Sequence, residues 1–138
     1  MPGNYKKLQA QITFDALMAT VHLEFTEIPD QQRANAKYGL TDFLCSAFAM
    51  FSLKSPALLA FEQRTKAESR NLESLYHINA IPSDTQMRVA LDPLDPAPLR
   101  ELVATLFATL QRAGGVKDYY FWRDSVLVAV AGVEHFSS

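Results

Sequence analysis

Basic side chains that could contact phosphate groups lie in and beside the polar segments of the first two thirds of the chain. They are Arg33, Lys37, Lys54, Arg64, Lys66, Arg70 and Arg88. If the fold brings them to one face, they form a modest phosphate-binding surface, because arginine and lysine are the usual donors to a nucleic-acid backbone. An ordinary solvated surface explains the same residues, and the charge pattern alone favours it.

A short capped segment is a second candidate for nucleic-acid contact. Residues 83–91 resemble the second helix of a helix-turn-helix, a position from which Gln86 and Arg88 could reach base edges. The connection from Tyr76 to Ser83 is longer than the usual turn of about three or four residues. The predicted DNA-binding residues are therefore Arg33, Lys37, Arg64, Lys66, Gln86 and Arg88.

Metal-ligating and nucleophilic side chains give weaker signals. The histidines at 22, 77 and 135 are far apart in the sequence, and a single cysteine cannot form a zinc-binding pair. Cys45 lies within an apolar segment, so we expect a small core residue. Gly114-Gly115 follows a predicted helix, whereas a phosphate-binding loop precedes one. Composition and spacing therefore predict neither a catalytic nucleophile nor a bound metal or cofactor.

The composition indicates one folded domain with little net charge. Of the 138 residues 49% are hydrophobic, and 13 Lys and Arg against 15 Asp and Glu give a net charge of −2. A generally basic nucleic-acid binder is excluded, although a local basic face is not. The longest apolar stretch, residues 43–51, is far shorter than the roughly 20 residues that span a bilayer. One cysteine and no signal peptide predict a soluble protein of a reducing compartment, without membrane contact.

Capping signals and apolar periodicity predict a mostly α fold, a compact bundle of about five helices. The segment 41–53 is apolar on all sides, so we expect it at the centre of the bundle or at an interface. Ser55-Pro56, the capping box from Ser83 to Gln86, and Asp95-Pro96 mark helix starts. The predicted helices are 4–27 with a break in the middle, 41–53, 56–65 with a short piece at 71–76, 83–91 and 95–113.

The pattern changes after Gly115. Residues 119–122 and 125–130 are aromatic and β-branched, and they predict a strand pair or one bent strand. The apolar run in the second segment is typical of a strand buried on both faces. We therefore divide the chain into a helical domain, 1–114, and a β segment, 115–138, that begins a sheet and is cut short.

Three strings, in order, resemble one family. Residues 28–33 (IPDQQR) with 38–42 (YGLTD) are similar to the "IPD-x-R … Y-x-L-x-D" opening of bacterial insertion-sequence transposases. Residues 81–92 (IPSDTQMRVALD) resemble their "IPSDTxxR…LD" segment, and 128–138 (VAVAGVEHFSS) resembles the "LLAIDG-x-x-xFSS" strand that begins their catalytic domain. The match covers roughly residues 14–138, and it resembles the N-terminal, transposase-associated helical domain of a DDE transposase.

The resemblance implies that the β segment starts an RNase H-like sheet in the parent protein. Such domains hold two divalent metal ions, Mg²⁺ in the intact enzyme, with three acidic residues. The first acid belongs just before the glycine of the third string, where this chain has Ala131. A methyl group cannot bind Mg²⁺, which requires oxygen ligands, and the later acids would lie beyond Ser138. The family position therefore predicts no catalytic residue in this chain.

The resemblance implies a role in DNA transposition. The domain would bind double-stranded DNA at transposon ends, weakly, or help assemble the synaptic complex in the bacterial cytoplasm, associated with the nucleoid. In the alternative, the chain is a protein-interaction module that forms a homodimer through the apolar segment 41–53, or a truncated inhibitor of the intact transposase. The near-neutral charge favours the alternative, and the basic residues at 33–37 and 64–70 favour DNA contact.

We predict that the purified chain neither nicks nor joins DNA in the presence of Mg²⁺ or Mn²⁺, because at most a fragment of the metal site is present. The measurement is strand cleavage of labelled duplex DNA on a denaturing gel. Metal-dependent cleavage that co-purifies with the chain would overturn this prediction.

Overall fold

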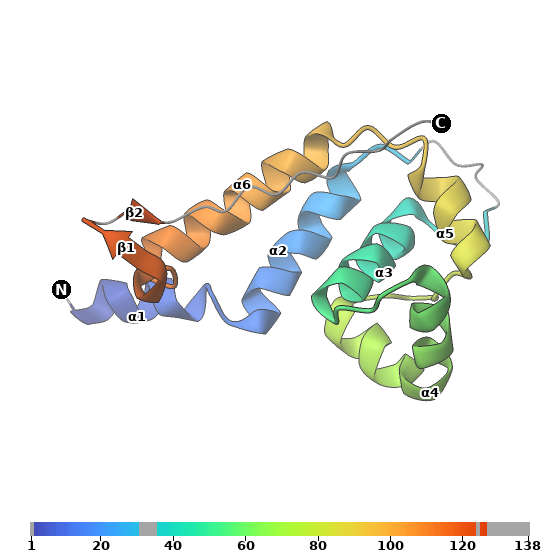
Figure 1. Cartoon of the computed structure of the whole chain (residues 1–138), viewed down its shortest axis with the longest axis horizontal. Helices are drawn as coiled ribbons and strands as arrows, with labels where there is room; N and C mark the ends of the chain where they lie inside the picture. Colours follow the sequence, from blue (N-terminus) through green and yellow to red (C-terminus); the bar gives the residue numbers. More distant parts are fainter. Residues whose placement is uncertain (1, 31–35, 124, 127–138) are drawn as a thin grey trace, which may run out of the picture.

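A computed structural model describes residues 2–30, 36–123 and 125–126. The fold is mostly α with a short C-terminal β segment, as the sequence predicts (Figure 1). The described elements are α1 (Pro2–Ala10), α2 (Phe14–Glu27), α3 (Leu40–Ser52), α4 (Leu58–Tyr76), α5 (Asp84–Leu91), α6 (Ala97–Arg112), a 3-10 turn (Lys117–Tyr119), β1 (Tyr120–Trp122) and β2 (Ser125–Val126).

The helices are arranged as a packed unit with a long extension. Helices α3, α4 and α5 lie against one another at one end of the molecule, and α2 packs on both α3 and α4. Helix α6 runs back alongside α2, so that α1 and the β segment meet at the other end (Figure 1). The core is buried between α2, α3 and α4 with a contribution from α6.

The first predicted helix is two helices. Residues 11–13 leave the helix, and the side chain of Thr13 caps α2 by accepting a hydrogen bond from the Ala16 N–H at 3.3 Å. Threonine suits a cap because its hydroxyl competes for backbone groups. The break that the sequence predicts is confirmed, whereas Asn4 lies inside α1 instead of capping it.

Helix α3 supplies the centre of the core, but it is not covered on every side. Leu44, Cys45 and Ala49 are buried, whereas the side chain of Phe51 is 74% exposed near the end of the helix. The expectation of a helix without a solvent-facing side is therefore wrong at its C-terminal turn. The buried positions are Leu40, Asp42, Phe43, Leu44, Cys45, Ser46 and Ala49.

Helix α4 departs most from the sequence prediction. Its start is at Leu58 and not at Pro56, because the Ser55 N–H donates to the Met50 carbonyl at 3.0 Å and so completes the end of α3. The predicted break between residues 65 and 71 corresponds to a kink at Glu68, where φ is −123° and ψ is 23°, so that α4 consists of two helical pieces that join at this residue. Tertiary burial of Leu72 and Tyr76 holds this polar stretch helical despite its weak pattern.

The predicted ends of the last two helices are confirmed with small shifts. Asp95 Oδ1 accepts the Ala97 N–H at 3.0 Å where α6 begins. Helix α6 ends at Arg112, and Gly114 follows with a φ of +76°, a left-handed conformation that glycine adopts without strain. The apolar stripe of α6 is only partly covered, because Leu102 is buried whereas Val103 is 64% exposed.

The C-terminal strand pair is confirmed over the described residues. Strand β1 pairs antiparallel with β2, with Tyr120 opposite Val126 and Trp122 opposite Ser125. The rest of the second predicted strand, from Leu127 on, lies outside the described residues. No helix of the described residues is long and apolar enough to cross a bilayer.

Substitution of one buried and one exposed phenylalanine tests which side chains belong to the core. Phe61 on α4 is 1% exposed, so Phe61→Ala should lower the free energy of unfolding by about 3–5 kcal/mol. Phe51→Ala, the same change at the exposed site, should change it by less than about 0.5 kcal/mol. Urea unfolding followed by circular dichroism measures both. Equal losses at the two sites would contradict this placement of the core.

Candidate nucleic-acid interface

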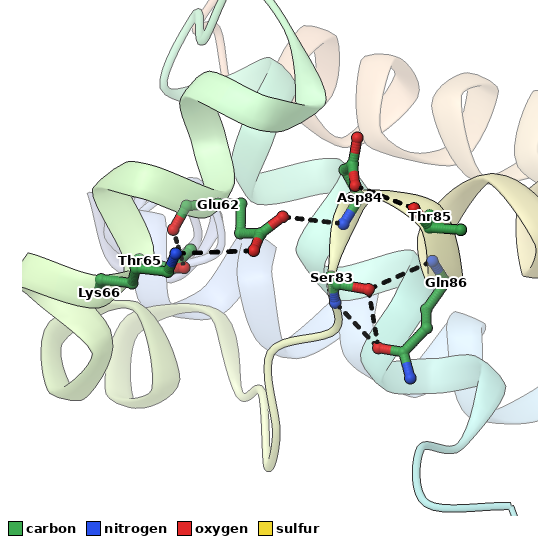
Figure 2. Close-up of polar contacts among 7 residues, drawn as sticks. All are labelled: Glu62, Thr65, Lys66, Ser83, Asp84, Thr85 and Gln86. Carbon is green, nitrogen blue, oxygen red and sulfur yellow. Dashed lines mark hydrogen bonds and ion pairs between the residues drawn. The ribbon is translucent and has the colours of Figure 1, made fainter.

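The N-terminus of α5, where the sequence predicts a DNA-reading helix, is closed by its own capping box (Figure 2). Ser83 Oγ accepts the Gln86 N–H at 3.4 Å, and Gln86 Oε1 accepts the Ser83 N–H at 3.0 Å. The Ser83 hydroxyl also donates to Gln86 Oε1 at 3.0 Å. Because the amide oxygen is held at the cap, a bidentate contact from Gln86 to a base would require the box to open.

A glutamate from α4 occupies the same helix end. Glu62 Oε2 accepts the Asp84 N–H at 3.3 Å, and Glu62 Oε1 pairs with Lys66 Nζ at 3.8 Å (Figure 2). Helix N-termini attract anions because their first N–H groups lack partners within the helix. The carboxylate of Glu62 therefore takes the place at α5 that a DNA phosphate would otherwise use.

The two predicted basic residues of α4 do not share a face. Each pairs with a glutamate one turn away, Arg64 with Glu68 at 3.5 Å and Lys66 with Glu62. Exposed pairs of this kind contribute only about 0–1 kcal/mol, so pairing alone does not prevent phosphate contact. Direction matters more, because each position turns by about 100° around an α helix, so that side chains two positions apart point roughly 160° apart. Arg64 and Lys66 therefore cannot both face one DNA backbone.

The other predicted contacts are scattered. Arg88 is exposed on α5, and the Lys37 ammonium lies 5.2 Å from the ring centroid of Tyr38, beside the start of α3. Arg33 lies outside the described residues. Arg64 and Lys66 thus point to opposite sides of α4, while Arg88 belongs to α5 and Lys37 to the segment before α3.

Cys45 is a core residue, as the sequence predicts. Its side chain is fully buried in α3, and burial, with a smaller contribution from the carboxylate of Asp42, raises the pKa of the thiol to about 12. A thiol nucleophile must ionise near neutral pH. Cys45 remains protonated there and is unsuited to covalent catalysis.

Two histidines that are far apart in the sequence lie side by side. The rings of His22 on α2 and His77 at the end of α4 have centroids 5.3 Å apart, with their planes inclined by 48°. Spacing along the chain does not reveal this pair, because the contact depends on how α2 packs on α4.

The resemblance to transposases places the first metal-binding acid at position 131. Ala131 lies outside the described residues, and within the described ranges no group of three or more His, Cys, Asp or Glu side chains could hold a metal ion. No family model matches the chain, and neither the curated proteins nor the solved structures give a match.

The buried thiol gives a direct test of the core. In the folded chain at pH 8, Cys45 should react with Ellman's reagent at least about a hundredfold more slowly than in 6 M guanidinium, because it is protonated and inaccessible. Absorbance at the thionitrobenzoate band measures the rate. Comparable rates in the two conditions would show that Cys45 is exposed.

Proposed function

We propose that this chain is the N-terminal, non-catalytic region of a DDE transposase and that it serves DNA transposition by helping to assemble the synaptic complex through protein contacts. Support for the family comes from the three ordered strings at 28–42, 81–92 and 128–138. Support for protein contacts comes from the distribution of charged and apolar side chains over the described surface.

Polar residues of the first two strings hold the helices together, which is the role expected of a family's fold signature. Asp30 Oδ2 accepts the Leu40 N–H at 2.8 Å, at the start of α3. Asp42 Oδ1 accepts the Asn79 N–H at 2.8 Å, between α4 and α5. Ser83 forms the capping box of α5. None of these side chains needs a substrate to explain its place.

One observation carries the assembly role: large apolar side chains of α6 and β1 are exposed to solvent. Val103 and Phe107, one turn apart on α6, are 64% and 45% exposed. Phe121 and Trp122 of β1 are exposed as well. Exposed aromatic and branched side chains of this kind mark protein interfaces more often than DNA interfaces, which are polar and strongly basic.

The predicted dimer helix is not the source of this surface. Helix α3, residues 40–52, uses most of its apolar side chains inside the chain's own core. The surface formed by Val103 and Phe107 on α6 is the better place for contact with a second copy, because it has no comparable internal partner among the described residues.

Binding of transposon-end DNA is the second candidate, and α5 favours it. Thr85 and Arg88 are exposed on this short capped helix, which protrudes at the edge of the helical unit (Figure 1). One cation with a few polar neighbours supplies weak binding, micromolar or poorer at physiological salt. Under this second candidate, DNA binding would account for the expected association with the nucleoid.

We expect a dimer that depends on α6. In sedimentation equilibrium the chain should show concentration-dependent dimerisation, and V103E/F107E should weaken it by about 10–100-fold, because two apolar contacts become charged. Leu23→Glu is the control, since Leu23 is exposed to a similar extent, 62%, but belongs to α2. A chain that stays monomeric at several hundred micromolar would contradict self-assembly.

A salt series separates the two candidates. Fluorescence anisotropy with random duplex DNA should give a dissociation constant of about 10 μM or weaker and a shallow salt slope, because few phosphates are neutralised. Arg88→Ala should change the slope by at most about one. Submicromolar binding at physiological salt, lost in Arg88→Ala and Thr85→Ala, would establish end binding in place of assembly.

A further inference from the structure

The distance between the two histidine ring centroids is close to the value expected for two imidazoles that share a metal ion. A zinc ion binds an imidazole nitrogen at about 2.0–2.1 Å, and that nitrogen lies ~1.1 Å from the centroid of its ring. If the angle between the two nitrogens at the ion is tetrahedral, the two ring centroids are roughly 5.2 Å apart. The centroids of His22 and His77 are 5.3 Å apart. Ordinary packing of two imidazoles does not require this value, although it permits it.

The backbone on each side of the two histidines is held in place. His77 is the left-handed C-cap of α4, with a φ of 55°, and it lies between the buried residues Tyr76 and Ile78. The N–H groups of His77 and Ile78 both donate to the Glu73 carbonyl, which closes the helix. On α2, His22 follows Val21, whose side chain is 1% exposed. Buried neighbours therefore anchor the backbone on each side of the pair, and little freedom is lost when an ion binds.

We infer that His22 and His77 form a zinc-binding site that joins α2 to the C-terminus of α4. Imidazole is a ligand suited to Zn²⁺, and both side chains reach solvent, because His22 is half-buried and His77 is exposed. Within the described residues no third His, Cys, Asp or Glu completes a cluster. The ion therefore keeps open positions for water, as catalytic zinc sites do, and it binds more weakly than a four-ligand structural zinc.

The site acts on the fold by linkage. An ion that binds the folded chain and not the unfolded one raises the melting temperature as its concentration exceeds the dissociation constant. His22 belongs to α2, and His77, more than fifty positions later in the sequence, is the C-cap of α4. A shared ion would therefore stabilise the packing of α2 on α4. This inference does not depend on the proposed function.

Calorimetric titration of the full chain, without an affinity tag, with ZnCl₂ at pH 7.5 tests the inference. We expect one ion per chain, with affinity reduced at least about tenfold in His22→Gln and in His77→Asn. Asparagine is chosen at 77 because it tolerates the left-handed conformation. His135→Gln is the control and should bind like the parent chain. Unchanged binding in both His22→Gln and His77→Asn, or no binding at all, overturns the inference.

A second measurement needs only folded parent chain and the control. In proton NMR the His135→Gln spectrum identifies the third histidine, so that the two remaining imidazole signals belong to His22 and His77. Both should shift together on addition of one equivalent of Zn²⁺, and the melting temperature should rise. A shift of the His135 signal alone, or of one member of the pair, would show that the two rings do not share an ion.

Discussion

The helical unit depends on one buried carboxylate. Asp42, in the first turn of α3, is 8% exposed, and its Oδ1 accepts the Asn79 N–H at 2.8 Å. The bond joins α3 to the connection between α4 and α5, next to the buried side chain of Ile78. A charge-assisted bond of this kind contributes about 1.5–3 kcal/mol, and a buried carboxylate without it would be costly. The bond therefore attaches the start of α3 to the connection that leads from α4 into α5.

The same logic explains why the motif residues are poor evidence for a catalytic or DNA-reading site. Asp30 and Asp42 accept backbone N–H groups, and Ser83 and Gln86 satisfy the start of α5. Glu62 adds a carboxylate at that same helix end. Acidic and amide side chains that already have backbone partners are held in place. Their spacing in the sequence is explained by the fold and does not require a bound substrate.

The features that could be predicted from the sequence are those set by local physics. The capping box of α5 and the glycine after α6 depend on residues within one turn, and both are confirmed. The break that the polar stretch of α4 predicts is present as a kink at Glu68, and burial of Leu72 and Tyr76 accompanies the second helical piece. The pairing of the histidines could not be predicted, because it depends on how α2 packs on α4. Resemblance supplied the family expectation, and the positions after Val126 that would test it lie outside the described residues.

The exposed side chains of α6 connect the fold to assembly. A helix that packs on α2 through Leu102 leaves Val103 and Phe107 on an adjoining face, because a stripe of this width exceeds what one neighbouring helix can cover. In a larger transposase complex that uncovered part would need another protein surface, since water is a poor environment for it. DNA is a less suitable partner than protein for this surface, because binding to its phosphate backbone requires several cations on one face of the protein. Arg64 and Lys66 point in nearly opposite directions. The exposed side chains of α6 and the opposite directions of Arg64 and Lys66 therefore both support the proposed assembly role.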